Sequence, residues 1–301
     1  MRIAVAATPA VAIPTLDALL ASEHELVSVI TKADAPAGRG RAMQSSPVAQ
    51  WGGANKVTVL KPDSKEDLGE LVKGLDLVVT IGYGFLIPLE ILRIPRHGFI
   101  NLHFSLLPRW RGAAPVQRAV EAGDSATGVT VFQLDAGMDT GPIYQSAQIP
   151  LSSTTTSEDL FNILAKLGVD PVLNTLDQIS RGIEPSAQRT DGATRANKLS
   201  KAEGEIDWSS DAETILRKIR AFDPNPGAWS AFRGQILKIN RARLSNESAP
   251  PAALVSKEKS IFVGTSTSAL ELLEVTPAGK SQMQAISWAN GARLNANDLL
   301  Q

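Results

Sequence analysis

Short apolar runs rich in valine and isoleucine alternate with amphipathic segments along the first half of the chain. The runs that predict β-strands cover residues 2–6, 26–31, 57–60, 77–81 and 99–103. Between them, apolar residues recur at spacings of three and four, which predicts helices over 14–22, 46–54 and 64–73. This alternation predicts an α/β fold with a doubly wound, mostly parallel sheet, because parallel strands need crossover connections that cover both faces.

The second half of the chain has a different pattern. Residues 128–135 and 143–151 predict two further strands, and residues 157–180 predict a long amphipathic helix interrupted near 168–171. The chain is polar from about 182 to 200, as expected of a linker. Beyond it, a helix is predicted over 211–222, and short strands over 229–232, 236–242, 253–256, 261–264 and 270–276. Such strands predict a small β-barrel or sandwich. The expected organisation is a domain over 1–182, a linker over 183–201 and a second domain over 202–301.

Polar side chains occur at the end of the fifth predicted strand. Asn101 and His103 are two residues apart, so on a strand they project from the same face. Ligands of parallel sheets bind at the carboxyl ends of strands. An amide donor beside a titratable imidazole suits reactions at a carbonyl group. Both residues can instead satisfy local backbone groups, but the basic, Trp-containing turn that follows favours a functional site.

Asp139 is the best candidate for a third member of this site. It lies in a glycine-rich loop between two predicted strands. A carboxylate beside an imidazole raises the pKa of the imidazole and fixes the orientation of the ring. Asp135, in the same loop, competes for this role, and capping of turn amides explains Asp139 equally well from the sequence alone.

Composition narrows the chemistry. The 301 residues have a net charge of -1, so the molecule as a whole does not attract polyanions. The absence of cysteine excludes disulfides and thiolate chemistry, and the three histidines lack metal-ligand spacing, so we expect no metal. The first strand is not followed by a Gly-x-Gly-x-x-Gly motif, which disfavours nicotinamide chemistry. No signal peptide or membrane-length apolar segment is recognisable, so a soluble, cytoplasmic protein is expected.

The motifs around these residues resemble a known family. Asn-x-His-x-Ser-Leu-Leu-Pro-x-x-x-Gly begins at residue 101, and Asp-x-Gly-x-Asp-Thr-Gly begins at residue 135. Together they resemble the folate-dependent formyltransferases. Pro-Ala-Gly-Arg-Gly at 36–40, Arg-Trp-Arg-Gly-Ala-Ala-Pro at 109–115 and Lys-Leu-Ser-Lys-x-Glu from 198 narrow the resemblance to the methionyl-tRNA formyltransferases. It extends from residue 2 to about residue 300.

The resemblance implies both the fold and the reaction. A Rossmann-like formyltransferase domain would be followed by an OB-like barrel that binds tRNA, in a monomeric chain. The formyl donor would be 10-formyltetrahydrofolate, and the acceptor the α-amino group of methionyl-initiator-tRNA. Asn101 and a protonated His103 would hold the charge on the formyl oxygen, and Asp139 would keep His103 charged. No metal is implied.

The resemblance also implies binding residues. Folate would lie along Ser105, Leu106, Leu107 and Pro108 and along the loop with Gly82, Gly84 and Leu86, with Asp135 nearby. The acceptor end of tRNA would meet Lys32, Arg39 and Arg41 in a mobile loop, while Arg241 and Arg243 would follow phosphates on the second domain. From the residues alone, Gly82 and Gly84 can simply form a turn. The lysine and the arginines can simply lie on a solvated surface.

One departure from the family pattern affects the acceptor pocket. Phe104 stands where the family usually has glycine, and it either narrows the pocket or turns into the core.

The rival functions are a formyltransferase for an amino sugar or another small amine, and an inactive tRNA-binding relative. An amino-sugar enzyme would share Asn101, His103 and Asp139 but would have no reason for Arg39, Arg41 and the second domain. The intact Asn101, His103 and Asp139 argue against an inactive relative.

Overall fold

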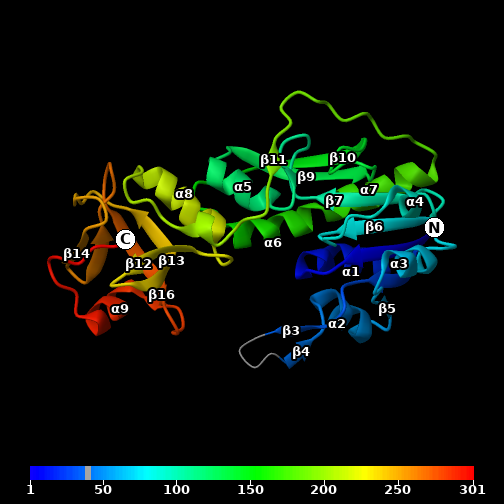
Figure 1. Ribbon diagram of the computed structural model, residues 1–301. Coiled ribbons are helices and arrows are strands. Elements are labelled where there is room, and N and C mark those ends of the chain that lie inside the picture. Colours follow the sequence, from blue (N-terminus) through cyan, green and yellow to red (C-terminus); the bar gives the residue numbers. More distant parts are fainter. Residues whose placement is uncertain (38–41) are drawn as a thin grey trace. The chain divides into compact units, whose positions relative to one another are not determined.

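A seven-stranded sheet forms the centre of the first half of the computed structural model, which describes residues 1–37 and 42–301. Its strands are β1 (Arg2–Ala7), β2 (Glu25–Ile30), β5 (Thr58–Leu60), β6 (Leu77–Ile81), β7 (Phe99–His103), β9 (Ala126–Gln133) and β10 (Ile143–Pro150). They lie in the order β10-β9-β7-β6-β1-β2-β5 (Figure 1). The strands from β7 to β5 pair in parallel, whereas β9 pairs antiparallel with both β7 and β10. The predicted mostly parallel sheet is therefore confirmed.

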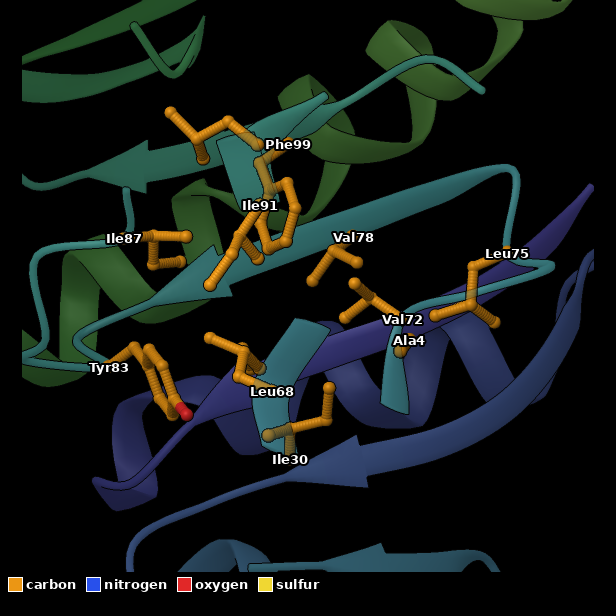
Figure 2. Packing of buried hydrophobic residues seen from close by; sticks show 12 residues of the cluster. Ala4, Ile30, Leu68, Val72, Leu75, Val78, Tyr83, Ile87, Ile91 and Phe99 are labelled. Carbon is orange, nitrogen blue, oxygen red and sulfur yellow. The ribbon is translucent and has the colours of Figure 1, made fainter. Parts of the chain in front are cut away.

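Helices cover both faces of this sheet. On one face, α3 (Lys65–Leu71) and α4 (Leu89–Leu92) contribute Leu68 and Ile91 to a buried cluster over Ala4, Val78 and Phe99 (Figure 2). On the other face, Gly52 of α2 (Pro47–Ala54) lies against side chains of β2 and β5. Successive residues of each strand face opposite sides, so apolar runs without polar alternation are required here. This arrangement confirms the doubly wound architecture.

The predicted long helix is two helices. α6 (Ser157–Leu167) and α7 (Val169–Ser180) meet at Gly168. A Cβ atom at Gly168 would lie 2.5 Å from the Leu102 side chain, so only glycine allows α7 to approach β7 this closely. The predicted cap of α3 is also present, since the Ser64 hydroxyl accepts a hydrogen bond from the Asp67 N–H at 3.0 Å.

Other short elements were not predicted. They are α5 (Pro115–Ala122), α9 (Ala285–Ala292), the strands β8 (Arg111–Gly112) and β11 (Arg195–Ala196), and the hairpin of β3 (Ala35–Ala37) and β4 (Ala42–Gln44). The helix predicted over 14–22, by contrast, is present as α1 (Ile13–Leu20). The hairpin flanks the predicted mobile loop, whose tip lies outside the described residues. The two-residue strands and the short hairpin are too short to show a period, whereas α5 does place buried apolar residues at helical spacing (116, 119 and 120) and was overlooked.

The chain divides into two units. The first comprises Met1–Pro115, Ala126–Pro150 and Phe161–Ala196, and the second comprises Val116–Ser125, Leu151–Leu160 and Asn197–Gln301. The polar segment up to Ala196 thus folds with the first unit. In the described residues, no helix has the length and apolar character needed to cross a bilayer.

An antiparallel sheet forms the second unit, beside α8 (Ala212–Phe222). Its main strands, in spatial order, are β12 (Ala228–Phe232), β13 (Gln235–Leu244), β16 (Leu270–Pro277), β15 (Ser260–Val263) and β14 (Leu254–Lys257). The C-terminal tail pairs with both ends of this order. The Ala231 N–H donates to the Gln301 carbonyl at 2.7 Å, and the Leu300 N–H donates to the Ala252 carbonyl at 2.9 Å. The tail thus closes the sheet, as expected of the predicted small barrel.

Candidate active site

His103 is buried at the end of β7 and is held by two different loops. Its Nε2 atom lies 2.9 Å from the Trp110 carbonyl oxygen. Because a carbonyl oxygen only accepts, Nε2 carries the proton of this hydrogen bond. The other ring nitrogen, Nδ1, lies 3.8 Å from Asp139 Oδ2. A neutral His103 therefore directs an unprotonated nitrogen toward a carboxylate.

Asp139, rather than Asp135, faces the imidazole. Asp139 Oδ2 also accepts a hydrogen bond from the Gly112 N–H at 2.7 Å. Asp135 instead shapes the loop, since its Oδ1 accepts from the Gly137 N–H at 3.0 Å and from the Thr140 hydroxyl at 2.8 Å. The structure thus distinguishes two carboxylates that the sequence could not separate.

Asn101 lies two residues before His103 on β7, so the two share a face of the sheet. Its Nδ2 donates to the Thr80 hydroxyl at 2.8 Å, and that hydroxyl donates to the Ile100 carbonyl at 3.0 Å. Thr80 is the neighbour of Asn101 in the β6–β7 register. The Thr80 hydroxyl therefore fixes the amide orientation, and within the described residues Asn101 retains a second N–H for a ligand.

The two residues that contact His103 share an unusual backbone conformation. Trp110 has a φ of 63° and Asp139 a φ of 55°, both in the left-handed region. Non-glycine residues adopt this conformation at a cost of about 1–3 kcal/mol and tend to do so at functional sites. The contacts to His103 are thus made by residues held in disfavoured backbone conformations.

Burial determines the charge of His103. Removal from water lowers the pKa of His103, and this effect outweighs the Asp139 charge and the Trp110 carbonyl, which both raise it. The net pKa lies below the usual value of 6.5, so the imidazole is neutral at pH 7. Asp139 thus favours the charged form of His103, as expected, but desolvation has the larger effect on the pKa and favours the neutral form.

The lowered pKa predicts how stability depends on pH. An unfolded chain binds a proton at His103 near pH 6.5, whereas the folded protein does so only at lower pH. The free energy of unfolding should therefore fall as pH decreases below about 6.5. Urea unfolding between pH 5 and pH 7.5 measures this, and His103→Gln should flatten the dependence. If the free energy of unfolding depended on pH as steeply in His103→Gln as in the wild type, His103 would not be the group responsible.

The predicted folate loop follows β6. Gly82 and Gly84 have φ values of 55° and 77°, and a Cβ atom at Gly82 would lie 2.8 Å from the Pro9 ring. The glycines therefore let this loop pass close to the residues after β1. Leu86 is 70% exposed, and Lys32 places its Nζ 4.9 Å from the centre of the exposed Phe85 ring. Lys32, predicted to contact tRNA, thus lies on the predicted folate loop.

The predicted folate turn at residues 105–108 has its own internal hydrogen bonds. The fully buried Ser105 hydroxyl donates to the Arg109 carbonyl at 2.7 Å, and the Leu107 N–H donates to the Thr130 hydroxyl at 3.1 Å. Leu107 is buried, whereas Leu106 and Pro108 are half-buried. The turn therefore offers Leu106 and Pro108 to a ligand, while Ser105 supports the backbone that leads to Trp110.

The predicted tRNA residues have varied surroundings. Arg39 and Arg41 lie outside the described residues. Arg243 Nε lies 2.7 Å from Glu271, and Arg241 lies 3.5 Å from Asp223, so both arginines have acidic partners. These pairs reduce the positive charge that either arginine presents to a phosphate.

Phe104 turns away from the site into the core. It is buried, with its ring centre 6.1 Å from that of Phe161. Leu102, on the same face of β7, contacts Gly168. Phe104 therefore packs beneath the sheet, and does not narrow a pocket beside Asn101 and His103.

Several supporting groups were not found by sequence reasoning. They are the Thr80 hydroxyl, the Trp110 carbonyl, the Gly112 N–H and the side chain of Gln188. Thr80 left a signal, because it is the one polar residue of an otherwise apolar strand. The backbone groups left none. In the part of the chain that the structure describes, no cluster of acidic or histidine side chains is arranged to bind a metal ion.

Known proteins and family models match this chain over most of its length. The family model described as "Formyl transferase" matches residues 1–176, and "Formyl transferase, C-terminal domain" matches residues 198–293. The chain is 44% identical to a methionyl-tRNA formyltransferase of Thermobifida fusca, with 98% of this chain and 97% of the relative covered.

Two solved structures share the fold at lower identity. An N-formyltransferase of Helicobacter canadensis, in complex with folinic acid and dTDP-3-aminofucose, has a TM-score of 0.69 at 18% identity, with 90% of this chain and 98% of that chain covered. A methionyl-tRNA formyltransferase of Clostridium thermocellum has a TM-score of 0.60 at 20% identity, with 82% and 94% covered. These likenesses concern the fold, whereas the sequence matches over the full length assign the family. The chain belongs to the formyl transferase family and, within it, to the methionyl-tRNA formyltransferases.

Proposed function

We propose that this chain transfers the formyl group of 10-formyltetrahydrofolate to the α-amino group of methionyl-initiator-tRNA, giving the formylmethionyl-tRNA that starts translation. The observation that carries the proposal is the buried His103 held between the Trp110 carbonyl and the Asp139 carboxylate, on the same face of β7 as Asn101. The full-length relatives named methionyl-tRNA formyltransferase support the acceptor. The folinic acid bound by the Helicobacter canadensis enzyme supports a folate donor.

The reaction moves one formyl group and one proton. The amine nitrogen attacks the formyl carbon, a new C–N bond forms, and negative charge develops on the formyl oxygen. The second N–H of Asn101 is the donor for that oxygen. His103 Nδ1 accepts the proton that the amine loses, and Asp139 stabilises the imidazolium. The bond from carbon to the folate nitrogen then breaks, and His103 returns the proton to that nitrogen.

A neutral His103 suits this sequence of steps better than a charged one. An α-amino group has a pKa of about 8, so a useful fraction is unprotonated near pH 7. The attacking amine becomes acidic as its bond to carbon forms, and a neutral imidazole can accept its proton. The nearby Asp139 carboxylate then lowers the cost of the positive charge that His103 gains during turnover.

The binding residues follow the same proposal. Folate lies along the loop of Gly82, Gly84 and Leu86 and along the turn of residues 105–108, near Asp135. The acceptor end of tRNA meets Lys32, Arg39 and Arg41, and the tRNA body follows Arg241 and Arg243. We further propose a catalytic domain over 1–182 and a tRNA-binding domain over 202–301 in a cytoplasmic monomer, joined by the connection over 183–201, whose part up to Ala196 packs on the first unit. Sedimentation of the purified protein measures its oligomeric state.

Three acceptors test the reaction. Purified protein is given 10-formyltetrahydrofolate with methionyl-initiator-tRNA, with a nucleotide-linked amino sugar or with glycinamide ribonucleotide. The proposal predicts a formylated product from the charged tRNA alone. Product from a small amine alone would assign the chain to another acceptor, and tRNA binding without product would mean that it is inactive.

Arg39→Ala should impair the use of tRNA. An arginine stacked on an unpaired base contributes about 0.5–2 kcal/mol, so kcat/KM for charged tRNA should fall about 2- to 30-fold. The KM for 10-formyltetrahydrofolate should be unchanged. Arg93→Ala, at an exposed position after α4, is the matched control. Wild-type tRNA kinetics in Arg39→Ala would remove this arginine from the proposal.

A further inference from the structure

The polar segment of residues 186–196 lies along both loops that contact His103. At one end, Ser186 and Ile143 exchange backbone hydrogen bonds of 2.7 and 2.9 Å just after the Asp139 loop. At the other end, β11 pairs in parallel with β8, and the Thr194 hydroxyl accepts from the Trp110 N–H at 2.9 Å. This segment therefore spans from the loop of Asp139 to the loop of Trp110 and Gly112.

Gln188 lies between these two ends and contacts both loops. Its Nε2 donates to the Asp139 carbonyl at 3.1 Å and to the Gly141 carbonyl at 3.0 Å. Its Oε1 accepts from Arg111 Nε at 2.7 Å and also from Arg111 Nη2. The orientation of the amide is unambiguous, because a flipped amide would direct its oxygen at two carbonyls and its nitrogen at a guanidinium.

We propose that Gln188 is a positioning residue for the formyl transfer proposed above, on which this inference rests. Through the Asp139 carbonyl, Gln188 fixes a left-handed residue whose carboxylate lies 3.8 Å from His103. Through Arg111, it ties that residue to the segment whose Trp110 carbonyl and Gly112 N–H contact His103 and Asp139. One amide thus sets the spacing between the groups that orient the imidazole and the carboxylate that stabilises it.

This role predicts effects on turnover rather than on binding. A displacement of about 1 Å in a catalytic group can cost about 100-fold in rate, so loss of Gln188 should lower kcat roughly 10- to 100-fold. Gln188 makes its contacts with the protein's own loops, so KM for tRNA and for folate should stay within about threefold of wild type. A residue that merely stabilised the fold would change the fraction of active enzyme without changing the pH dependence of kcat.

Two variants of Gln188 distinguish the contacts of the amide nitrogen from those of the amide oxygen. Gln188→Met keeps the approximate shape and removes every hydrogen bond. Gln188→Glu keeps an oxygen for Arg111 but removes both donors and directs a carboxylate toward two carbonyls. Gln148→Met, at an exposed position of β10, is the matched control. Both Gln188 variants should lose kcat, and the control should not. Wild-type kcat in Gln188→Glu would overturn the proposal, because the contact with Arg111 alone would then suffice.

A second readout does not require the reaction. Among the residues that the structure describes, Asp139 is the charged group that raises the pKa of His103, and the ring also contacts the Trp110 carbonyl and the Phe132 ring. When the Asp139 loop is released, the pKa of His103 measured by NMR in the free protein should decrease further. An unchanged pKa in both Gln188 variants would overturn the proposal. Absence of formyl transfer by the wild-type protein would instead contradict the proposed function and leave this measurement as the test of Gln188.

Discussion

His103→Ala is expected to lower kcat about 10²- to 10⁴-fold, the usual contribution of a side chain that transfers protons in the rate-limiting chemistry. Alanine removes the group that takes the proton from the attacking amine and returns it to the leaving folate nitrogen. It also removes the hydrogen bond to the Trp110 carbonyl, which then loses a partner. Single-turnover formation of formylmethionyl-tRNA under saturating folate and tRNA measures the chemical step directly.

Binding distinguishes a catalytic from a structural role for His103. Affinity for charged tRNA, measured by filter binding, should remain near wild type in His103→Ala. His97→Ala, a half-buried position in the turn before β7, is the matched control and should retain full activity. An equal loss of tRNA affinity and turnover in His103→Ala would mean that His103 maintains the structure of the site.

Asn101→Ala is expected to lower kcat about 10²- to 10³-fold, as when a donor to a developing oxyanion is lost. The effect should fall on kcat, because the charge on the formyl oxygen develops only as the amine attacks. The exposed Asn174→Ala on α7 is the matched control.

Thr80→Val tests the same role of Asn101 with a smaller expected loss of kcat. It leaves the Asn101 amide in place but removes the hydroxyl that orients it. A lost hydrogen bond of about 1 kcal/mol corresponds to a decrease of about fivefold in kcat, well below the effect of Asn101→Ala. A larger loss in Thr80→Val than in Asn101→Ala would contradict the role of Asn101 as the oxyanion donor.

Local patterns predicted the elements that position the site. The strand that carries Asn101 and His103 was predicted over the residues it occupies, 99–103, because its apolar run is short and is followed by a turn. The period of two then places both side chains on one face without further information. The helix break at Gly168 was visible for the same reason, since glycine and proline interrupt helical periodicity locally.

These local patterns do not predict contacts between segments that are far apart in the sequence. Gln188 is separated by 49 residues from Asp139 and by 77 from Arg111, so no local rule connects them. The distinction between Asp135 and Asp139 depends on how one loop folds back on itself. The charge of His103 depends on burial, and a sequence that shows a neighbouring carboxylate does not show how completely water is excluded.

We propose that Asn101, His103 and Asp139 act together on one formyl group. The structure of this protein bound to a stable, formylated analogue of the folate donor tests it directly. We expect the formyl oxygen about 3 Å from Asn101 Nδ2, with His103 within one hydrogen bond of the site of proton transfer and Asp139 beside it. A formyl group bound away from β7, with no contact to Asn101 or His103, would contradict these roles.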